Sequence, residues 1–384
     1  MQAFTLEDIS KLRKMKKKVV HYFILATLTL SFSCSNDNLI ETYIYNIPET
    51  INDGLNVSSL DDVGLDMKSI EFMINYINDF KHIHSILILR DEKLVLEEYF
   101  EEYTRNSLNN TYSVTKSFCS ALVGIAIDKQ YINNVHDPIK TYLTEYDIDW
   151  TGKENIEISH LLTMSSGFEW DESSAPYTSR QNSHIKMNYS GEQVKYVLQR
   201  PIASNPGTNW VYNSGGVTVL GKIISNSSNM EFDTFSTKYL FQPLGITEHK
   251  WYKYPSGIYL TSGDLKLKSR DMLKFGLLYL NNGRWKDQQI ISEEWIKSSV
   301  NDYIKTSRPE VYYGYLWWKR PLLMLNGQRI EGYTAEGFGG QCIFVLPTYN
   351  MVVVFTSGID WDEGKLTYQP VEILQQFILP AIKQ

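Results

Sequence analysis

The sequence predicts an α+β protein, α/β sandwich-like in architecture, in which helices flank one antiparallel sheet that is built from both chain ends. Three observations support this fold class. Strand-like apolar runs occupy residues 83–100 near the start of the chain and recur over 313–357 near its end. Between them, residues 132–265 read as short helices and loops rich in Ser, Asn, Gly and Pro, which predicts a mostly helical insert. We expect a ligand cleft between the sheet and this insert.

The first elements are a helix, a strand pair and a second helix. Helical periodicity predicts a helix over 67–80, and two strands are expected at 83–90 and 94–100 around a polar turn. A second helix is expected over about 112–129, because its apolar residues recur at helical spacing and would be buried in a core: Val114, Phe118, Ala121, Leu122, Ile125 and Ala126.

The elements after the insert are expected to complete the sheet and cover it. The pattern predicts helices over 269–281 and 292–299, strands over 313–319, 339–346 and 351–357, and a closing amphipathic helix over 368–382.

The N-terminal residues resemble a targeting segment rather than part of the fold. Lys16-Lys-Lys18 precedes an apolar run, Val19–Phe32, that is too short to span a membrane comfortably, and Met15 offers a second start. Cys34 then precedes a polar stretch, as in a bacterial lipoprotein processing site, so we expect a lipid-anchored cell-envelope protein. An ordinary signal peptide would instead leave a periplasmic or secreted protein.

The chain is therefore expected to contain three parts: a signal segment at 1–33, a tether at 34–60 and one domain at 61–384. The 384 residues are 43% hydrophobic, which is ample for a sizeable core. The net charge of -7 argues against a nucleic-acid partner.

Ser113-Val-Thr-Lys116 opens the helix expected at 112–129. A serine hydroxyl becomes a good nucleophile when a nearby base takes its proton. Lys116 lies one helical turn from Ser113, and desolvation inside a cleft favours the neutral amine that such a base requires. Backbone N–H groups in the first turn of a helix are unpaired and can stabilise negative charge. One helix start can therefore supply a nucleophile, a base and half of an oxyanion hole.

By itself this S-x-x-K pattern is weak, because Ser183-His-Ile-Lys186 matches it too. That second copy lies in a polar stretch without an apolar helical stripe, so we interpret it as a chance match. For Ser113 and Lys116, the alternative interpretation is a helix-capping serine and a surface lysine.

Three further segments accompany Ser113 and Lys116. Tyr212 lies in a Gly-rich loop before an apolar helix, His160–Gly167 ends a short helix at a glycine, and Gly337-Phe-Gly-Gly-Gln341 precedes a strand. In this order, the motifs resemble those of the serine β-lactamase-like hydrolases, which include class C β-lactamases, D-Ala-D-Ala carboxypeptidases, esterases and 6-aminohexanoate-oligomer hydrolases. The resemblance covers about residues 60–380 and implies a β-lactamase/penicillin-binding-protein-like fold.

The resemblance also implies roles for individual residues. Ser113 would be the acylated nucleophile and Lys116 its proton acceptor. Tyr212, the tyrosine of the family's Y-x-N motif, would pass a proton to the leaving group and later activate water. The oxyanion hole would consist of the backbone N–H groups of Ser113 and Gln341.

Two departures from the family pattern bear on the substrate. Ser214 stands where the Y-x-N motif has asparagine. The third family motif, usually Lys or His followed by a small residue and Gly, aligns with Phe338-Gly339-Gly340. Ser214, Phe338, Gly339 and Gly340 are therefore the expected substrate-binding positions. Because Phe338 supplies no cation for a substrate carboxylate, we expect an ester or neutral amide, or a different anchor.

No cofactor or metal is expected. The 7 His show no metal-ligand spacing, and no G-x-S-x-G nucleophile elbow occurs. Besides Cys34, the chain contains Cys119 and Cys342, which we expect to be buried free thiols, although a disulfide is possible in an exported protein.

The functional prediction is a serine hydrolase that forms an acyl-enzyme on Ser113 and cleaves an ester or amide of a small molecule or peptide. One alternative is a penicillin-binding or sensor-type protein with little turnover. Another is a β-lactamase or D-Ala-D-Ala peptidase. Intact Ser113, Lys116 and Tyr212 argue against a purely structural surface protein.

Overall fold

The computed structural model describes residues 43–78, 82–324, 326–358 and 369–383. The chain divides into two units, 1–42 and 43–384, and the description below concerns the second. The predicted signal segment 1–33, Cys34 and the tether up to residue 42 lie outside the described residues.

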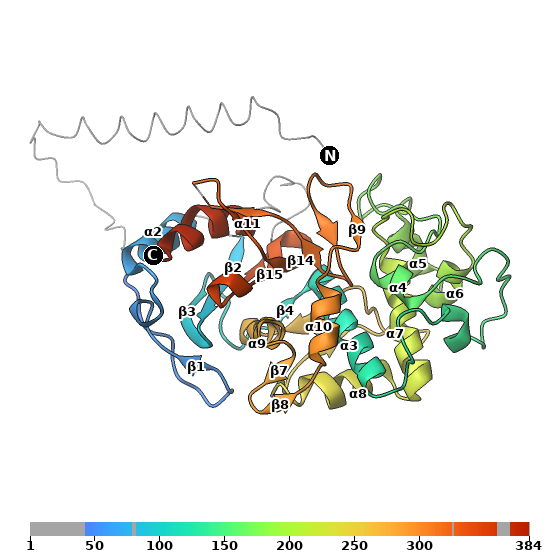
Figure 1. Ribbon diagram of the computed structural model, residues 1–384, viewed down its shortest axis with the longest axis horizontal. Coiled ribbons are helices and arrows are strands. Elements are labelled where there is room, and N and C mark those ends of the chain that lie inside the picture. Colours follow the sequence, from blue (N-terminus) through green and yellow to red (C-terminus); the bar gives the residue numbers. More distant parts are fainter. Residues whose placement is uncertain (1–42, 79–81, 325, 359–368, 384) are drawn as a thin grey trace, which may run out of the picture. The chain divides into compact units, whose positions relative to one another are not determined.

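In the described part of the chain, nine strands form the main sheet in the order β1-β3-β2-β16-β15-β14-β11-β10-β9 (Figure 1). All neighbours are antiparallel except β1 and β3. β2 from the start of the domain pairs with β16 near its end, so the predicted α+β fold with a sheet built from both chain ends is confirmed. The strands are β1 Asn56–Val57, β2 Ile83–Arg90, β3 Lys93–Tyr99, β9 Ile304–Lys305, β10 Tyr312–Tyr313, β11 Trp318–Lys319, β14 Tyr333–Gly337, β15 Gln341–Leu346 and β16 Met351–Ser357.

Different helices cover the two faces of this sheet (Figure 1). Ile88 and Val353 point to the face covered by α2 and the C-terminal helix α11, whereas Leu87 and Val354 point to the core that contains α3 and α9. Because both faces are buried, the strands read as continuous apolar runs. The helices are α2 Met67–Ile77, α3 Thr115–Asp128, α9 Ser269–Leu280 and α11 Gln369–Ile373, which continues through a π-helical turn, Leu374–Ile378, and a 3-10 turn, Leu379–Ala381.

A group of helices from the middle of the chain lies beside the sheet, drawn in green and yellow in Figure 1. Within it, α7 contacts α4, α6 and α8 and also the sheet-packed helix α3. These helices are α4 Ile158–Leu162, α5 Ser183–Tyr189, α6 Gln193–Leu198, α7 Ser214–Ser228 and α8 Phe232–Ser236. The insert boundaries at about 132 and 265 stay a prediction.

The remaining described elements are short. They comprise a three-stranded sheet, β4-β6-β5, two hairpins, β12-β13 and β7-β8, and the helix α10. They are β4 Asn109–Asn110, β5 Lys250–Trp251, β6 Leu265–Leu267, β7 Arg284–Trp285, β8 Gln288–Gln289, α10 Glu293–Ser299, β12 Leu322–Leu323 and β13 Arg329–Ile330.

One element differs from its prediction. The strand expected over 313–319 is a tight hairpin in which Tyr313 of β10 pairs with Trp318 of β11. The Gly314 N–H donates to the Trp317 carbonyl at 2.9 Å, and Leu316 adopts a left-handed φ of 62°. The chain reverses where the sequence has a single glycine and otherwise large apolar residues, so periodicity alone could not reveal the turn.

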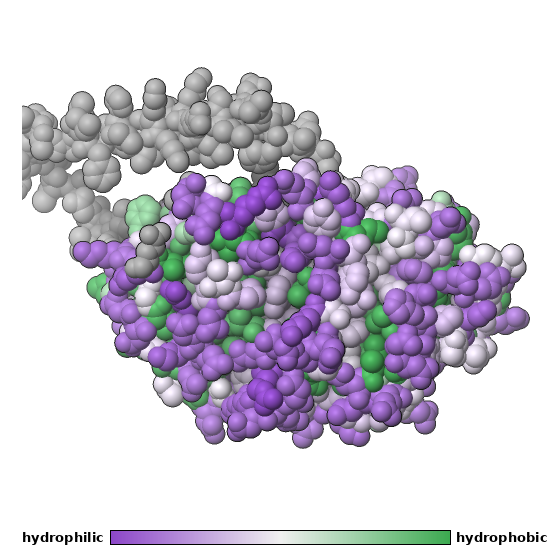
Figure 2. Space-filling view, in the orientation of Figure 1, coloured by the Kyte–Doolittle hydropathy of each residue, from purple (hydrophilic) through white to green (hydrophobic). Residues whose placement is uncertain are grey.

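The surface of the described part is mainly hydrophilic on the face seen in Figure 2, with hydrophobic residues in small separate patches. Within residues 43–383, apart from the gaps given above, no helix has the length and apolar character needed to cross a membrane.

Candidate active site

Ser113 lies in a 3-10 turn, Tyr112–Val114, that leads directly into α3. The preceding segment is fixed in place, because the Thr111 N–H donates to the Leu265 carbonyl at 2.9 Å. Tyr112 has a left-handed φ of 45°, and its N–H donates to Asn110 Oδ1 at 2.9 Å. A left-handed non-glycine residue next to a candidate nucleophile is typical of strain held at a functional site.

Lys116 is buried, with 2% of its surface exposed, so it is not a surface lysine. Its Nζ lies 2.9 Å from Ser113 Oγ and donates to the Ser262 carbonyl at 2.7 Å. The same Nζ lies 4.9 Å from the centre of the Tyr212 ring. The three predicted catalytic side chains are therefore neighbours, although 99 positions separate Ser113 from Tyr212 in the sequence.

Tyr212 is held on a segment bound at both sides. The Val211 N–H donates to the Met164 carbonyl at 2.8 Å, and the Asn213 N–H donates to Met164 Sδ at 3.1 Å. Asn213 then caps α7, because its Oδ1 accepts from the Gly216 N–H at 2.9 Å. This cap fixes where the helix starts and so fixes the position of Tyr212 relative to it.

Aromatic rings support Tyr212 on the side of the main sheet. Trp318 stacks on Tyr212 with ring centroids 6.0 Å apart, and Trp210 lies 6.1 Å from Tyr212. Tyr313 contacts both tryptophans, at 4.8 Å from Trp318 and 5.9 Å from Trp210. The hairpin that the sequence did not predict thus supplies the wall behind the candidate catalytic tyrosine.

The Gly-rich motif brings the head of β15 next to the nucleophile turn. β14 and β15 both contact the turn that carries Ser113. A Cβ on Gly337 would lie 2.4 Å from the Thr111 carbonyl oxygen, so only glycine permits this approach. The Gln341 side chain is bound to β16, because its Oε1 accepts from the Ser357 N–H at 3.2 Å. These contacts fix the backbone at Gln341, the predicted second oxyanion donor.

Phe338 packs against the residue that precedes the nucleophile. Its ring meets the Tyr112 ring edge-on, with centroids 5.6 Å apart. Gly339 and Gly340 follow with φ of 73° and 90°, which turn the chain into β15. Where the family pattern has a cation or imidazole, this chain therefore has Phe338, whose ring pairs with that of Tyr112.

Ser214 is 3% exposed and is bound by a residue that the sequence analysis missed. The Ser214 N–H and Oγ both donate to the carboxylate of Glu172, at 2.6 and 2.8 Å. Glu172 is itself buried, and it lies in a segment in which the sequence analysis singled out no residue. No spacing or periodicity relates Glu172 to Ser214, so the sequence contained no usable signal for this contact.

The second S-x-x-K copy lies on α5 and shows other contacts. Ser183 Oγ accepts from the Asp171 N–H at 3.0 Å, and Lys186 is exposed. Between them, His184 Nδ1 is buried without a hydrogen-bond partner in the described structure. Burial lowers the pKa of His184, and the charge of Lys116 lowers it further, whereas Glu172 and Asp264 oppose this shift.

Cys119 and Cys342 are buried and free, which confirms the prediction for these two residues. Burial raises the pKa of Cys119 to about 12 and also raises that of Cys342, so both remain thiols at neutral pH.

The described residues contain no group of three or more His, Cys, Asp or Glu side chains placed to hold a metal ion. The expected absence of a metal and of a cofactor stays a prediction.

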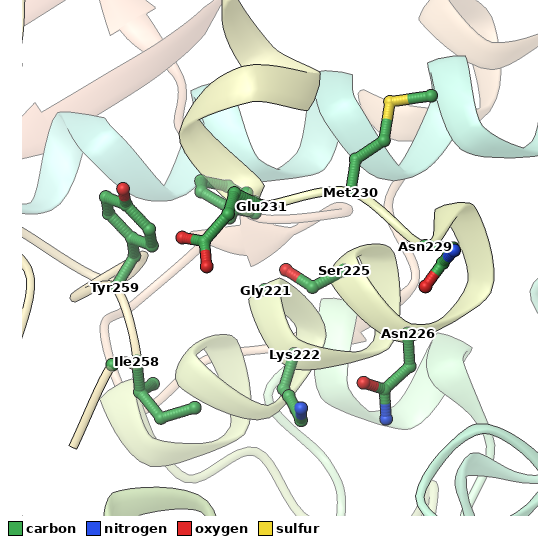
Figure 3. Close-up of a pocket in the computed structure, with 11 residues that line it drawn as sticks. Gly221, Lys222, Ser225, Asn226, Asn229, Met230, Glu231, Ile258 and Tyr259 are labelled. Carbon is green, nitrogen blue, oxygen red and sulfur yellow. The ribbon is translucent and has the colours of Figure 1, made fainter.

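A pocket of about 350 Å³ lies beside the C-terminal half of α7, remote in sequence from Ser113 (Figure 3). Lys222 and Asn226 line it from α7, with Glu231 and Tyr259 opposite (Figure 3). None of the predicted site residues lines this pocket.

Comparisons with known proteins bear on the family and the fold. The family model named Beta-lactamase matches residues 84–368. The 6-aminohexanoate-dimer hydrolase of Paenarthrobacter ureafaciens is 21% identical over 289 residues, which cover 70% of this chain and 71% of that protein. A protein of Salmonella agona, provisionally named a D-alanyl-D-alanine carboxypeptidase, is 21% identical over 251 residues, and the match spans 54% of its length.

Solved structures support the fold. A Bacillus anthracis protein, provisionally named a 6-aminohexanoate-dimer hydrolase, superimposes with a TM-score of 0.66 at 20% identity. The match covers 80% of this chain and 82% of that one. A penicillin-binding protein homologue from Pyrococcus abyssi also superimposes, with a TM-score of 0.60 at 18% identity over 82% of this chain and 77% of that one. The predicted β-lactamase/penicillin-binding-protein-like fold is therefore confirmed.

Proposed function

This chain belongs to the beta-lactamase family of hydrolases, and from that premise we propose that it cleaves an ester or amide through an acyl-enzyme on Ser113. The observation that carries the proposal is the distance of 2.9 Å between Lys116 Nζ and Ser113 Oγ, in a buried position beside Tyr212. A nucleophile and its base within hydrogen-bond reach are the signature of covalent catalysis.

In the proposed reaction, Lys116 accepts the proton of Ser113 while Oγ attacks the substrate carbonyl. The backbone N–H groups of Ser113 and Gln341 stabilise the oxyanion that forms. Tyr212 donates a proton to the leaving oxygen or nitrogen as its bond to the carbonyl carbon breaks. Water then attacks the acyl-enzyme and Tyr212 takes a proton from that water, while Lys116 returns its proton to Ser113 Oγ as the bond between Oγ and the acyl carbon breaks.

The substrate proposed is a small molecule or a peptide with an uncharged group near the scissile bond. The Phe338 and Tyr112 rings supply an apolar surface where a cation would be needed to hold a carboxylate. Penicillins and D-Ala-D-Ala peptides present such a carboxylate, whereas simple esters and neutral amides do not. Ser214, Gly339 and Gly340 remain predicted substrate-binding positions, although Ser214 is bound by Glu172.

The second candidate is a penicillin-binding or sensor-type protein with little turnover, or a β-lactamase or D-Ala-D-Ala peptidase. The provisional name of the Salmonella relative favours this class. Labelling with a fluorophosphonate or a fluorescent penicillin, followed by a chase, separates these possibilities. Rapid loss of a penicillin label indicates turnover, a persistent label indicates a sensor, and labelling by the fluorophosphonate alone supports an esterase or amidase.

The proposed location is the cell envelope, with a lipid anchor on Cys34. The support is the order of basic residues, apolar run, cysteine and polar tether in the sequence. A periplasmic or secreted enzyme is the alternative.

A further inference from the structure

Glu172 carries a buried carboxylate whose two oxygens accept four hydrogen bonds. Oε1 accepts from the Ser214 N–H at 2.6 Å and from Trp170 Nε1 at 2.5 Å. Oε2 accepts from Ser214 Oγ at 2.8 Å and from the Tyr177 hydroxyl at 2.7 Å. Only 8% of Glu172 is exposed, so these donors replace the water that a carboxylate needs.

Two of these bonds reach the start of α7. Ser214 is the first residue of this helix, where N–H groups are unpaired and the helix dipole favours a negative charge. Asn213 caps the helix from the other side through the Gly216 N–H. A buried anion and a side-chain cap together hold the helix start at one position.

That position determines where Tyr212 lies, because only Asn213 separates Tyr212 from Ser214. Tyr177, five residues further along the chain, donates to the same carboxylate. Burial raises the pKa of Tyr177 well above its usual range, and the charge of Glu172 raises it further, so its hydroxyl stays a donor to Glu172. Tyr177 and Glu172 are therefore connected to Tyr212 through Ser214 and the backbone between them.

On the basis of the function proposed above, we propose that Glu172 is a positioning residue for the catalytic Tyr212. The serine at 214 has a shorter side chain than the asparagine of the Y-x-N motif, and Glu172 binds both its N–H and its hydroxyl. The hydrogen bonds of Glu172 reach Ser214, two residues from Tyr212, so its effect on Tyr212 passes through the start of α7.

The test uses steady-state hydrolysis of p-nitrophenyl butyrate by purified Glu172→Gln. The amide keeps the shape but can accept hydrogen bonds at only one of its two ends, so two of the four donors lose their acceptor. We expect kcat to fall tenfold to a hundredfold while KM stays within threefold, because placement of the proton donor matters more for the chemical step than for binding. An unchanged kcat would overturn the proposal.

A double-mutant cycle separates positioning from general structural damage. In Tyr212→Phe, which lacks the hydroxyl to be positioned, Glu172→Gln is expected to lower kcat less than twofold further. An equal loss in both backgrounds would show that Glu172 does not act through Tyr212. The matched control is Glu97→Gln, another buried carboxylate, which pairs with Arg270 away from the site. It is expected to lower the melting temperature and leave kcat within twofold.

Two further variants keep the outcome clear. If Glu172→Gln does not fold, Tyr177→Phe removes one of the four donors and should lower kcat twofold to fivefold, with no further loss in Tyr212→Phe. A loss that persists in that background refutes the positioning role. Ser113→Ala is measured in parallel. If Ser113→Ala keeps its activity, the proposed function itself fails. If Ser113→Ala is inactive and Glu172→Gln is fully active, only the proposed role of Glu172 is refuted.

Discussion

Phe338 and Tyr112 set the chemical character of the site at the scale of single residues. Their rings meet edge-on beside the nucleophile, and Tyr112 adopts its left-handed backbone conformation there. An aromatic pair attracts apolar groups and offers no full positive charge to a carboxylate. The identity of residue 338 therefore bears directly on which of the family's substrates this protein can use.

The first prediction concerns substrate preference. We expect kcat/KM for p-nitrophenyl acetate or butyrate to exceed that for nitrocefin and for a D-Ala-D-Ala peptide, because Phe338 provides no carboxylate anchor. Phe338→Lys adds the missing positive charge and should reduce the difference in kcat/KM between the esters and the carboxylate substrates. Phe338→Ala is the control for loss of the ring alone. A wild-type preference for nitrocefin or the peptide over short-chain esters would refute this account of Phe338.

The second prediction concerns metals. Since the histidines show no ligand spacing, activity should survive EDTA treatment and dialysis, with kcat unchanged within error. The measurement is ester hydrolysis before and after chelation, with added zinc as the control. Loss of activity on chelation and its return with zinc would contradict a mechanism that relies on Ser113, Lys116 and Tyr212.

The sequence could predict Ser113, Lys116 and Tyr212 because each lies in a recognisable local pattern. The structure places them together, and their catalytic roles stay predictions. Glu172 could not be predicted, because its contacts with Ser214 and Tyr177 depend on how loops fold over one another. A lone acidic residue in a polar stretch looks the same in a sequence whether it is solvated or buried.

Among the elements, α7 links the insert to the site, and the first of its two adjacent glycines, Gly215, is needed for packing. A Cβ on Gly215 would lie 2.6 Å from the Trp170 ring and 2.7 Å from a Val197 methyl group. A Cβ on Gly216 would have as its nearest neighbour a Leu161 methyl group at 3.3 Å, which lies at the end of a flexible side chain. Two adjacent glycines in one helix thus face very different surroundings.

The third prediction follows from this difference. Gly215→Ala should lower the free energy of unfolding by about 1–3 kcal/mol, the usual range for overpacking a core. Gly216→Ala is the matched control and should change it by less than about 1 kcal/mol, since alanine also favours the helix. Chemical denaturation of both variants provides the measurement, and equal stabilities would contradict the packing described for α7.

Elements with strong periodicity were predictable, and those set by tertiary contacts were not. α2, β2, β3, α9 and β16 lie where their apolar patterns placed them. The hairpin β10-β11 was wrongly predicted as one strand. Its turn is stabilised by a hydrogen bond in which the Leu316 N–H donates to the Leu162 carbonyl at 3.0 Å. A contact between segments so distant in sequence leaves no local signal.

At the scale of the whole molecule, the sheet joins both ends of the domain and the helical insert supplies Tyr212. Ser113 lies in the turn that leads into α3, which packs on the sheet, whereas Tyr212 lies two residues before α7 of the insert. The site therefore forms only when the two parts of the domain fold together. The family resemblance, which rests on the order of the motifs, predicted that Ser113 and Tyr212 lie together. Local sequence patterns alone could not predict this.

The fourth prediction concerns location. The full-length protein should fractionate with membranes and resist extraction by high salt, because a lipoprotein cysteine carries two or three acyl chains. Cys34→Ala should become soluble and keep its esterase activity, since the anchor lies outside the domain. Cell fractionation with an activity assay checks both outcomes. Mass spectrometry that finds a mature N-terminus beyond Cys34, without lipid, would rule out the anchor.

Intact-mass spectrometry after fluorophosphonate labelling tests whether Ser113 is the acylated nucleophile. The wild-type protein should gain one adduct, mapped to Ser113 by peptide sequencing, and lose its hydrolysis of p-nitrophenyl butyrate. Ser113→Ala should take no adduct and lose activity by on the order of a thousandfold or more, whereas Ser183→Ala should behave as wild type. An adduct on Ser183, or full activity in Ser113→Ala, would contradict the account.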